Sequence, residues 1–356
     1  MIATSGIDPR TSSRSDRFDY HAPWWLLGNG AVGGNAQTIW PVLFATRFTG
    51  SKPAFVRERW ATPDGDFIDV DRLASDVAPH VASGREPAQS GAPLLVLFHG
   101  LEGSSSSHYA LAFADRARVL GWSFAIPHFR GCSGEMNLMP RAYHSGDHEE
   151  IGWMLKRFKE GHDGPVLAVG VSLGGNALLR WAEEAGDGAA QIASAIAAVS
   201  APIDLTASGH AIGAGFNRHV YTRMFMNSMR PKALAKLMQF PELFDRAALM
   251  STRDLYEFDN VFTAPLHGFK GTDDYWSRAS AKPRLRDIRI PALVLNALND
   301  PFVPRQSLPG PADDVGSHVT LWQPAQCGHV GFPHGWFPGN VLEMPARVLQ
   351  WLKART

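Results

Sequence analysis

Three side chains that lie far apart in the chain have the types and the order that nucleophilic acyl transfer requires. Ser172 stands in Gly170-Val-Ser172-Leu-Gly174, and Asp300 and His329 follow it in that order. A serine hydroxyl is a poor nucleophile at neutral pH, so it needs an adjacent base, and an acid must orient that base. In this order Asp300 would hold His329 in the required tautomer. His329 would accept the Ser172 proton and return it to the leaving group.

The residues around Ser172 predict a strand, a sharp turn and a helix. Residues 166–171 are apolar and rich in valine, which indicates a strand buried on both faces, and residues 174–184 indicate a helix. A serine at such a turn takes a strained backbone conformation, and the flanking glycines avoid collisions with the neighbouring strand and helix. The helix N-terminus favours negative charge nearby. The same residues could also form an ordinary Gly-Ser turn, so the interpretation depends on the partner residues.

The two partners each follow an apolar run that is predicted to be a late strand. Residues 290–296 precede Asp300, and residues 318–322 precede His329. Open α/β sheets collect their functional residues at the carboxyl ends of the strands, so these side chains are expected to meet above one edge. Among fourteen histidines, His329 stands out for its glycine neighbours and for its place between the last strand and the last helix.

The acid has two alternative assignments. Asp300 could be a turn former ahead of Pro301. Asp204, which follows a strand predicted at residues 196–200, could supply the carboxylate instead. The chain order of nucleophile, acid and histidine favours Asp300.

Two backbone amides are predicted to bind a developing oxyanion. His99-Gly-Leu101-Glu-Gly103 follows a strand predicted at residues 94–98, where this architecture keeps one donor. The other donor comes directly after the nucleophile. The amides of Leu101 and Leu173 are therefore expected to form the oxyanion hole. His99 is expected to be a structural residue that forms hydrogen bonds beneath the site.

Metal and thiol chemistry are not favoured by the remaining candidates. His144 and His148 have helical spacing, but they lack the glutamate of a zinc-binding H-E-x-x-H motif, and Gly146 weakens a helix there. Neither Cys132 nor Cys327 stands in a Gly-x-Cys-x-Gly frame. The two cysteines could pair, but a count of two is typical of a reducing compartment. No metal is expected.

A literal Gly-x-Gly-x-x-Gly match occurs at residues 28–33. A dinucleotide fingerprint follows a strand, opens a helix and has an acid about twenty residues later. Here the preceding apolar run is short, Pro41 would interrupt the helix, and neither Arg47 nor Lys52 is an acid. These residues are therefore expected to form a glycine-rich loop, and no cofactor is expected.

Strands and helices alternate along most of the chain. Residues 55–60 and 67–70 flank an Asp-Gly turn and predict a β-hairpin. Later strands are predicted at 94–98, 122–126, 166–171, 196–200, 290–296 and 318–322, with helices at 108–120, 147–159, 174–184 and 342–353. Asp147 is the expected N-cap of the second of these helices. Such alternation predicts an α/β fold with a mostly parallel, doubly wound sheet.

The β/α alternation stops between residues 204 and 283, where helical patterns at 217–229, 231–238, 241–250 and 253–262 take over. We expect this helical insertion to cover the carboxyl edge of the sheet as a cap. Its methionines and aromatic residues could line a pocket for an acyl chain or could pack helix against helix. They are Met224, Met226, Met229, Met238, Met250, Phe216, Tyr221, Phe225, Phe240 and Phe244. The expected division is a flexible leader at 1–22, a core at 23–203 and 284–356, and the cap at 204–283.

The composition is that of an ordinary globular enzyme. Of the 356 residues, 45% are hydrophobic and 19% are charged, so the chain can bury a sizeable core. Lys+Arg and Asp+Glu both number 34, which leaves no overall charge for nucleic acid or an anionic membrane. No signal peptide and no membrane-spanning run is recognisable. A cytoplasmic location is expected, with a small molecule as partner; the oligomeric state is left open.

Beyond the three side chains, several motifs resemble those of one family. They are Pro23-Trp-Trp-Leu, Asn35-Ala-Gln-Thr-Ile39, His99-Gly-Leu-Glu-Gly103, Phe129-Arg-Gly-Cys-Ser-Gly134, Arg141-Ala-Tyr-His-Ser-Gly146, Gly170-Val-Ser-Leu-Gly-Gly175, Ala264-Pro-Leu-His-Gly-Phe269, Asn299-Asp-Pro-Phe302 and Gly328-His-Val-Gly-Phe332. From about residue 23 onward, the chain resembles the α/β-hydrolase superfamily. Within it, the chain is similar to the AB-hydrolase-4 family of bacterial YheT-type hydrolases and their eukaryotic esterase and phospholipase relatives. The resemblance implies a triad at Ser172, Asp300 and His329.

The function expected from these residues is hydrolysis of carboxylic esters with short-to-medium acyl chains. Ser172 would form an acyl-enzyme, and no metal or organic cofactor would take part. Two alternatives remain open. The same triad could transfer the acyl group to an alcohol, or the chain could be a non-catalytic binding protein with this fold.

Overall fold

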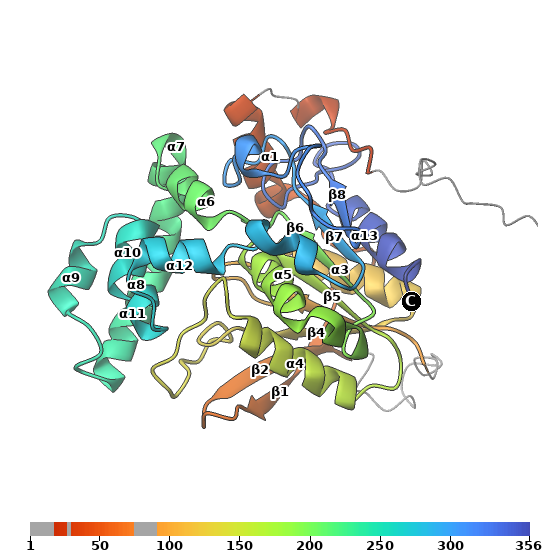
Figure 1. The fold of residues 1–356 in the computed structure, drawn as a ribbon. Helices are drawn as coiled ribbons and strands as arrows, with labels where there is room; N and C mark the ends of the chain where they lie inside the picture. Colours follow the sequence, from red (N-terminus) through yellow and green to blue (C-terminus); the bar gives the residue numbers. More distant parts are fainter. Residues whose placement is uncertain (1–17, 27–29, 75–90) are drawn as a thin grey trace, which may run out of the picture.

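A computed structural model describes residues 18–26, 30–74 and 91–356 of the chain (Figure 1). Within these residues, eight strands form one sheet in the order β1-β2-β4-β3-β5-β6-β7-β8. The strands are β1 (Phe55–Ala61), β2 (Phe67–Leu73), β3 (Leu94–Phe98), β4 (Ser123–Pro127), β5 (Val166–Val171), β6 (Ala195–Val199), β7 (Ala292–Leu295) and β8 (Val319–Trp322). Only the pairings of β2, with β1 and with β4, are antiparallel. The predicted doubly wound, mostly parallel sheet is confirmed.

The central strands are buried on both faces, as their unbroken apolar sequences predict. Every residue of β3 and β5 is buried. In β3, Leu94 and Val96 contribute to one hydrophobic cluster, and Leu95 and Leu97 contribute to the other. Because successive side chains of a strand point to opposite faces, each central strand joins two separate cores.

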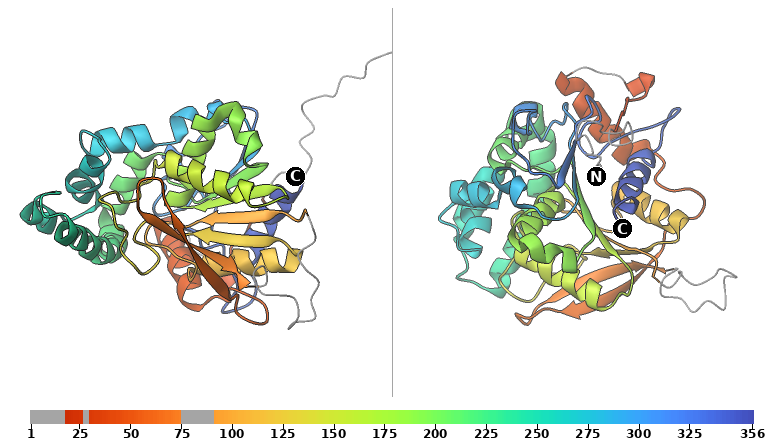
Figure 2. Two further views of the ribbon diagram at one scale, coloured as in Figure 1. Left: turned by 90° about the horizontal axis from the view of Figure 1, so that it is seen from below. Right: turned by 45° about the vertical axis from the view of Figure 1, so that its right-hand side comes forward.

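Helices cover both faces of this sheet (Figure 2). α4 and α5 supply side chains to the cluster on one face, and α3 and α13 supply side chains to the cluster on the other. The helices outside the insertion are η2 (Trp24–Leu26), α1 (Gly30–Phe44), α3 (His108–Leu120), α4 (His148–Glu160), α5 (Leu173–Ala185), η3 (Gly186–Gln191), η6 (Arg305–Ser307) and α13 (Glu343–Lys353). The predicted N-cap of α4 is confirmed, since the Asp147 side chain accepts from the Glu150 amide. No described helix is long and apolar enough to cross a membrane.

The segment between β6 and β7 is almost entirely helical and lies at the left of Figure 1. Its helices are α6 (Leu205–Ile212), α7 (Gly215–Asn217), the π-helical turn η4 (Arg218–Thr222), α8 (Arg223–Gln239), α9 (Arg246–Ser251), α10 (Leu255–Val261), α11 (Thr263–Leu266), α12 (Thr272–Ala279) and η5 (Lys282–Asp287). The sequence predicts two helices that meet near Pro231, which is wrong, because α8 continues through this proline. A proline in a helix removes one backbone hydrogen bond. Burial of Phe225, Met226, Ala233 and Lys236 stabilises α8 on both sides of it.

The N-terminal helix α1 also contradicts the sequence prediction, because residues 30–34 are helical and the helix continues through Pro41. Pro41 has no N–H group to donate to the Gln37 carbonyl four residues earlier. Gly331 packs directly against that carbonyl, so closely that a Cβ on Gly331 would lie 1.9 Å from the oxygen. The missing helical bond thus leaves a carbonyl against which the loop after β8 can pack.

The end of the expected leader is part of the core. Phe18 and Tyr20 are buried, and the Phe18 ring lies 5.4 Å from that of Trp322 and 5.8 Å from that of Phe332. The Tyr20 hydroxyl donates to the Pro333 carbonyl at 2.6 Å. Residues 18–22 therefore pack against the region around β8, and residues 1–17 of the expected leader lie outside the described residues.

Candidate active site

Ser172 occupies the turn between β5 and α5 in a strained backbone conformation. Its φ and ψ are 52° and −120°, a region that non-glycine residues adopt only when their surroundings impose it. A Cβ on Gly170 would lie 2.3 Å from the Gly174 carbonyl oxygen, and a Cβ on Gly174 would lie 2.5 Å from that of His99. The glycines therefore let strand, turn and helix approach closely enough to hold the serine at the tip of the turn.

The structure brings Ser172, His329 and Asp300 together in one chain of hydrogen bonds. The His329 Nε2 atom lies 2.9 Å from the Ser172 Oγ atom, and its Nδ1 atom lies 2.8 Å from Asp300 Oδ2. The Asp300 side chain is completely buried. Its other oxygen accepts from the amides of Phe302 and Val303 at 2.8 and 3.2 Å. A carboxylate held in this way fixes the ring so that Nε2 faces the serine and can accept its proton.

Residues for which the sequence analysis predicts no role hold His329 in place. The His329 amide donates to the Thr38 hydroxyl of α1 at 2.8 Å. The Asn299 side chain accepts from the amides of Cys327 and Gly328, both at 3.0 Å, and donates to the Gln37 side chain at 2.9 Å. These residues belong to motifs that carry the family resemblance, which was the only sequence signal for them. α1 thus connects the loops that carry the acid and the base.

The alternative candidates lie elsewhere. The Asp204 side chain caps α6 by accepting from the Ala207 amide at 3.0 Å, so it is not directed to His329. Cys132 and Cys327 are both free thiols. Among the described residues no group of histidine, cysteine and acidic side chains could hold a metal ion. The His144 Nδ1 atom instead accepts from the Gly146 amide.

The two expected oxyanion donors, Leu101 and Leu173, line the same cavity as Ser172. The loop that carries Leu101 lies against Ser172, since a Cβ on Gly100 would lie 3.2 Å from the Ser172 Cβ. Neither the Leu101 amide nor the Leu173 amide donates a hydrogen bond within the described part of the chain. Both N–H groups are thus available to an oxygen bound beside Ser172.

His99 lies beneath this loop as a neutral ring. Its Nε2 atom accepts from the Phe129 amide at 3.1 Å, so its Nδ1 atom carries the proton and donates to the Gly100 carbonyl at 2.7 Å. Complete burial, followed by the nearby His128 ring, lowers the pKa of His99 to about 3. A permanently neutral His99 fits the structural role expected for it.

A cavity of about 140 Å³ adjoins Ser172, with a largely apolar wall. The apolar side chains of this wall include Leu101, Met136, Leu173, Leu205, Ile212, Phe225, Met229, Leu255, Phe258, Phe262, Trp276 and Phe302. Of the methionines and aromatic residues singled out in the insertion, only Phe225 and Met229 are among the lining residues. Met224, Met238, Met250 and Phe216 are exposed instead.

One polar group of the wall joins the helical insertion to the loop of Leu101. Glu102 has a left-handed backbone with φ of 56°. Its amide donates to the Tyr143 hydroxyl at 3.0 Å, and that hydroxyl donates to Glu102 Oε1 at 2.7 Å. From α8, the Lys232 Nζ atom reaches both carboxylate oxygens, at 2.9 and 2.8 Å. Tyr143 and Lys232 therefore hold the residue next to a candidate oxyanion donor.

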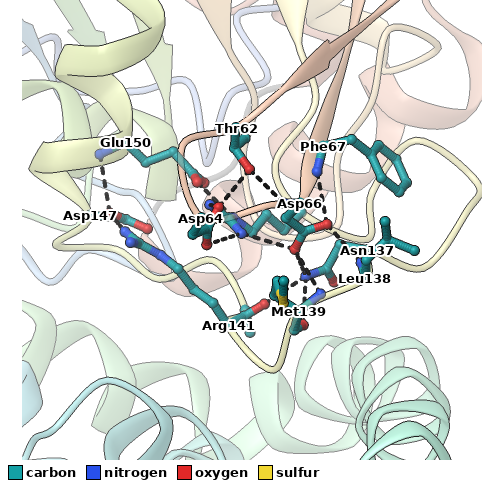
Figure 3. Close-up of polar contacts among 12 residues, drawn as sticks. Thr62, Asp64, Asp66, Phe67, Asn137, Leu138, Met139, Arg141, Asp147 and Glu150 are labelled. Atoms are coloured by element: carbon teal, nitrogen blue, oxygen red, sulfur yellow. Dashed lines mark hydrogen bonds and ion pairs between the residues drawn. The ribbon is translucent and has the colours of Figure 1, made fainter.

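A second polar network, drawn in Figure 3, includes Arg130 and Asn137 of the cavity wall. The Arg130 guanidinium donates to Glu150, Asp64 and Asp66 at 2.6–2.9 Å. Asp66, at the β1–β2 turn, also accepts from the Asn137 side chain at 2.6 Å. These bonds fix the loop of residues 137–141. The insertion binds this loop too, since the Lys236 ammonium of α8 donates to the carbonyls of residues 137 and 139, both at 2.6 Å.

Comparisons with known proteins agree with this geometry. The sequence model of the family described as alpha/beta hydrolase fold matches residues 93–335. Escherichia coli YheT, an esterase by name, is 38% identical over 89% of both chains. Mouse phospholipase ABHD3 is 28% identical over 86% of this chain and 74% of its own. The Pyrococcus furiosus esterase Pf2001 shares the fold at a TM-score of 0.51, with 15% identity over 88% of this chain and 99% of its own.

The family match covers more than half of the chain, and the similarity to YheT extends over most of both proteins. The sheet order, the turn that carries Ser172 and the loops after β7 and β8 are those of the same architecture. The chain therefore belongs to the alpha/beta hydrolase fold family, in the AB-hydrolase-4-like group of YheT and ABHD3.

Proposed function

We propose that the protein is a serine hydrolase that cleaves carboxylic esters of short-to-medium acyl chains through an acyl-enzyme. The observation that carries this proposal is the pair of contacts of His329, at 2.9 Å to Ser172 Oγ and 2.8 Å to Asp300 Oδ2. Relatives named as esterase, phospholipase and monoacylglycerol lipase support the same class of reaction.

In the first half of the reaction, the Ser172 oxygen attacks the ester carbonyl carbon while His329 Nε2 takes the hydroxyl proton. The carbonyl oxygen becomes an oxyanion, to which the amides of Leu101 and Leu173 donate. The carbon–oxygen bond to the alcohol then breaks, and the imidazolium gives its proton to the leaving alcohol. Asp300 stabilises the imidazolium without taking a proton itself.

In the second half, water attacks the acyl carbon while His329 Nε2 takes its proton. The bond from that carbon to the Ser172 oxygen then breaks, the acid leaves, and the imidazolium returns the proton to the Ser172 oxygen. The cavity of about 140 Å³ would contain the acyl chain. The largely apolar wall of this cavity supports an acyl chain as its occupant. Phe225 and Met229 of the insertion contribute to the wall, which supports its role as a cap.

The test compares the wild type with Ser172→Ala on nitrophenyl esters of increasing chain length, together with fluorophosphonate labelling. We expect turnover and labelling in the wild type and neither in the variant, with turnover falling beyond medium chains. Wild-type turnover that survives in Ser172→Ala would refute the proposal. A wild type that neither labels nor turns over any ester would favour a binding protein. Ester products formed with added ethanol would favour acyl transfer.

A further inference from the structure

Helices η2 and α1 and the loop at residues 335–338 expose large apolar side chains. Trp336, Trp24 and Phe337 are 84%, 71% and 68% exposed, and Leu43 and Phe44 are exposed as well. We call these five side chains the aromatic surface. Exposed apolar groups that gather in one place are uncommon on soluble proteins and mark sites of interaction.

Two half-buried tryptophans connect Phe44 of the helix with Phe337 of the loop. The Trp40 ring lies 4.5 Å from that of Phe44 and 5.4 Å from that of Phe337. The Trp25 ring lies 5.6 Å from Trp40 and 5.7 Å from Phe337. The indole N–H groups of Trp25 and Trp40 donate to carbonyls of the loop, at 3.1 and 2.9 Å. Helix and loop therefore form one continuous surface rather than separate exposed residues.

The two chain segments that carry this surface lack carboxylates, although acidic residues flank them and the whole chain has no net charge. Neither residues 20–57 nor residues 315–342 contain an aspartate or a glutamate. Arg47 and Lys52 follow α1 directly. A surface with cations and no carboxylates attracts an anionic partner, and lipid headgroups at a membrane surface supply such charge.

The position of α1 makes it accessible to a flat partner such as a membrane surface. The helix lies at the outer edge of the molecule, at the top of Figure 1 and of the right-hand view in Figure 2. Tryptophan, phenylalanine and leucine with neighbouring cations are the residues with which interfacial helices enter the boundary between headgroups and acyl chains.

We propose that the aromatic surface docks the protein on an anionic lipid surface. The five side chains enter the headgroup–acyl boundary, and Arg47 and Lys52 face lipid phosphates. This binding is independent of ester hydrolysis. Since the Thr38 hydroxyl of α1 accepts from the His329 amide, the docked face is the opposite side of the helix that holds the site.

The test is flotation of the full chain with vesicles of phosphatidylcholine alone or with 30 mol% phosphatidylglycerol. We expect wild-type protein to bind the anionic vesicles, less so at high salt, and Trp336→Ser/Phe337→Ser to lower the ratio of bound to free protein at least tenfold. Met238→Ser is the matched control, because Met238 is 80% exposed on α8, away from this surface. Fluorophosphonate labelling and thermal melting check that each variant is folded.

Three results would overturn the proposal. The first is a wild type that floats with neither vesicle, and the second is binding that the double substitution leaves unchanged. The third is a stable dimer in size-exclusion chromatography that the double substitution dissociates, which would assign the surface to a second copy of the chain. If the double variant is unfolded, Trp336→Ser alone decides the question, since its side chain is the most exposed of the five.

Discussion

Replacing Lys232 by methionine tests whether the helical insertion acts on the oxyanion loop. The ammonium of Lys232 bonds both oxygens of Glu102, whose left-handed backbone directly follows Leu101. A residue other than glycine in this conformation is disfavoured by about 1–2 kcal/mol, so its neighbours must hold it there. Lys232→Met removes the charged contact and leaves the Tyr143 hydroxyl and the Cys132 thiol as contacts of the Glu102 carboxylate. We therefore expect the Leu101 amide to be less well placed for the oxyanion.

The size of the effect follows from the geometry of that contact. A hydrogen bond between charged groups contributes roughly 1.5–3 kcal/mol. The Lys232 side chain is 31% exposed, so screening by water reduces this to about 1–1.5 kcal/mol. If this energy holds the loop in the transition state, kcat falls roughly 5–12-fold. The largest loss of transition-state stabilisation expected is that of one complete oxyanion donor, which is about 3 kcal/mol.

The assay is steady-state hydrolysis of a short nitrophenyl ester, with kcat and KM determined separately. We expect kcat to fall with KM within about threefold of wild type, because the contact acts mainly on the transition state. Lys232→Arg should recover most of the activity. Lys156→Met, at the exposed Lys156–Glu160 pair of α4, should have no effect. An unchanged kcat in Lys232→Met, with only a lower melting temperature, would show that the contact serves stability alone.

Three further outcomes are expected. Asp300→Asn should lower kcat about 10⁴-fold, because the amide holds His329 in the wrong tautomer, and should leave the melting temperature nearly unchanged. A loss of kcat below tenfold would argue against Asp300 as the acid. Gly34→Ala should lower the free energy of unfolding in urea by about 1–3 kcal/mol and reduce activity, because the new Cβ would lie 2.1 Å from the Asn299 carbonyl oxygen. A variant with wild-type stability and activity would contradict this packing of α1. In the folded protein the pKa of His99 is about 3, below its unfolded value of about 6.5. The unfolded state therefore binds more protons between these two values, and the free energy of unfolding falls as pH drops from about 6.5 toward 3. Between pH 7 and pH 5 the loss from His99 should be about 2 kcal/mol, and His99→Asn should remove that part of the slope in urea unfolding.

Much of the fold could be predicted because its signals are local. Each strand of the central sheet is a short apolar run, and each core helix has its own pattern or cap, such as Asp147 before α4. The grouping of Ser172, Asp300 and His329 depends on chain order and on the edge of the sheet at which strands end, and both can be read along the sequence.

The errors concern residues whose conformation depends on distant partners. α1 continues through Pro41 where the loop after β8 packs against the Gln37 carbonyl, a contact that no local pattern encodes. The contact of Lys232 with Glu102 depends on how the insertion docks, 130 residues away along the chain. For the same reason, the exposed methionines of the insertion could not be distinguished from Met229, which lines the cavity.

The hydrogen bond from the His329 amide to Thr38 has a consequence for the order of folding. Its two residues are 291 positions apart, so the bond can form only after the last strand has been synthesised and has joined the sheet. Contacts of such long sequence separation form late, because the intervening chain must first be ordered. During refolding, recovery of esterase turnover should therefore lag behind the far-ultraviolet signal of the helices, and chains truncated before β8 should acquire secondary structure without a working nucleophile.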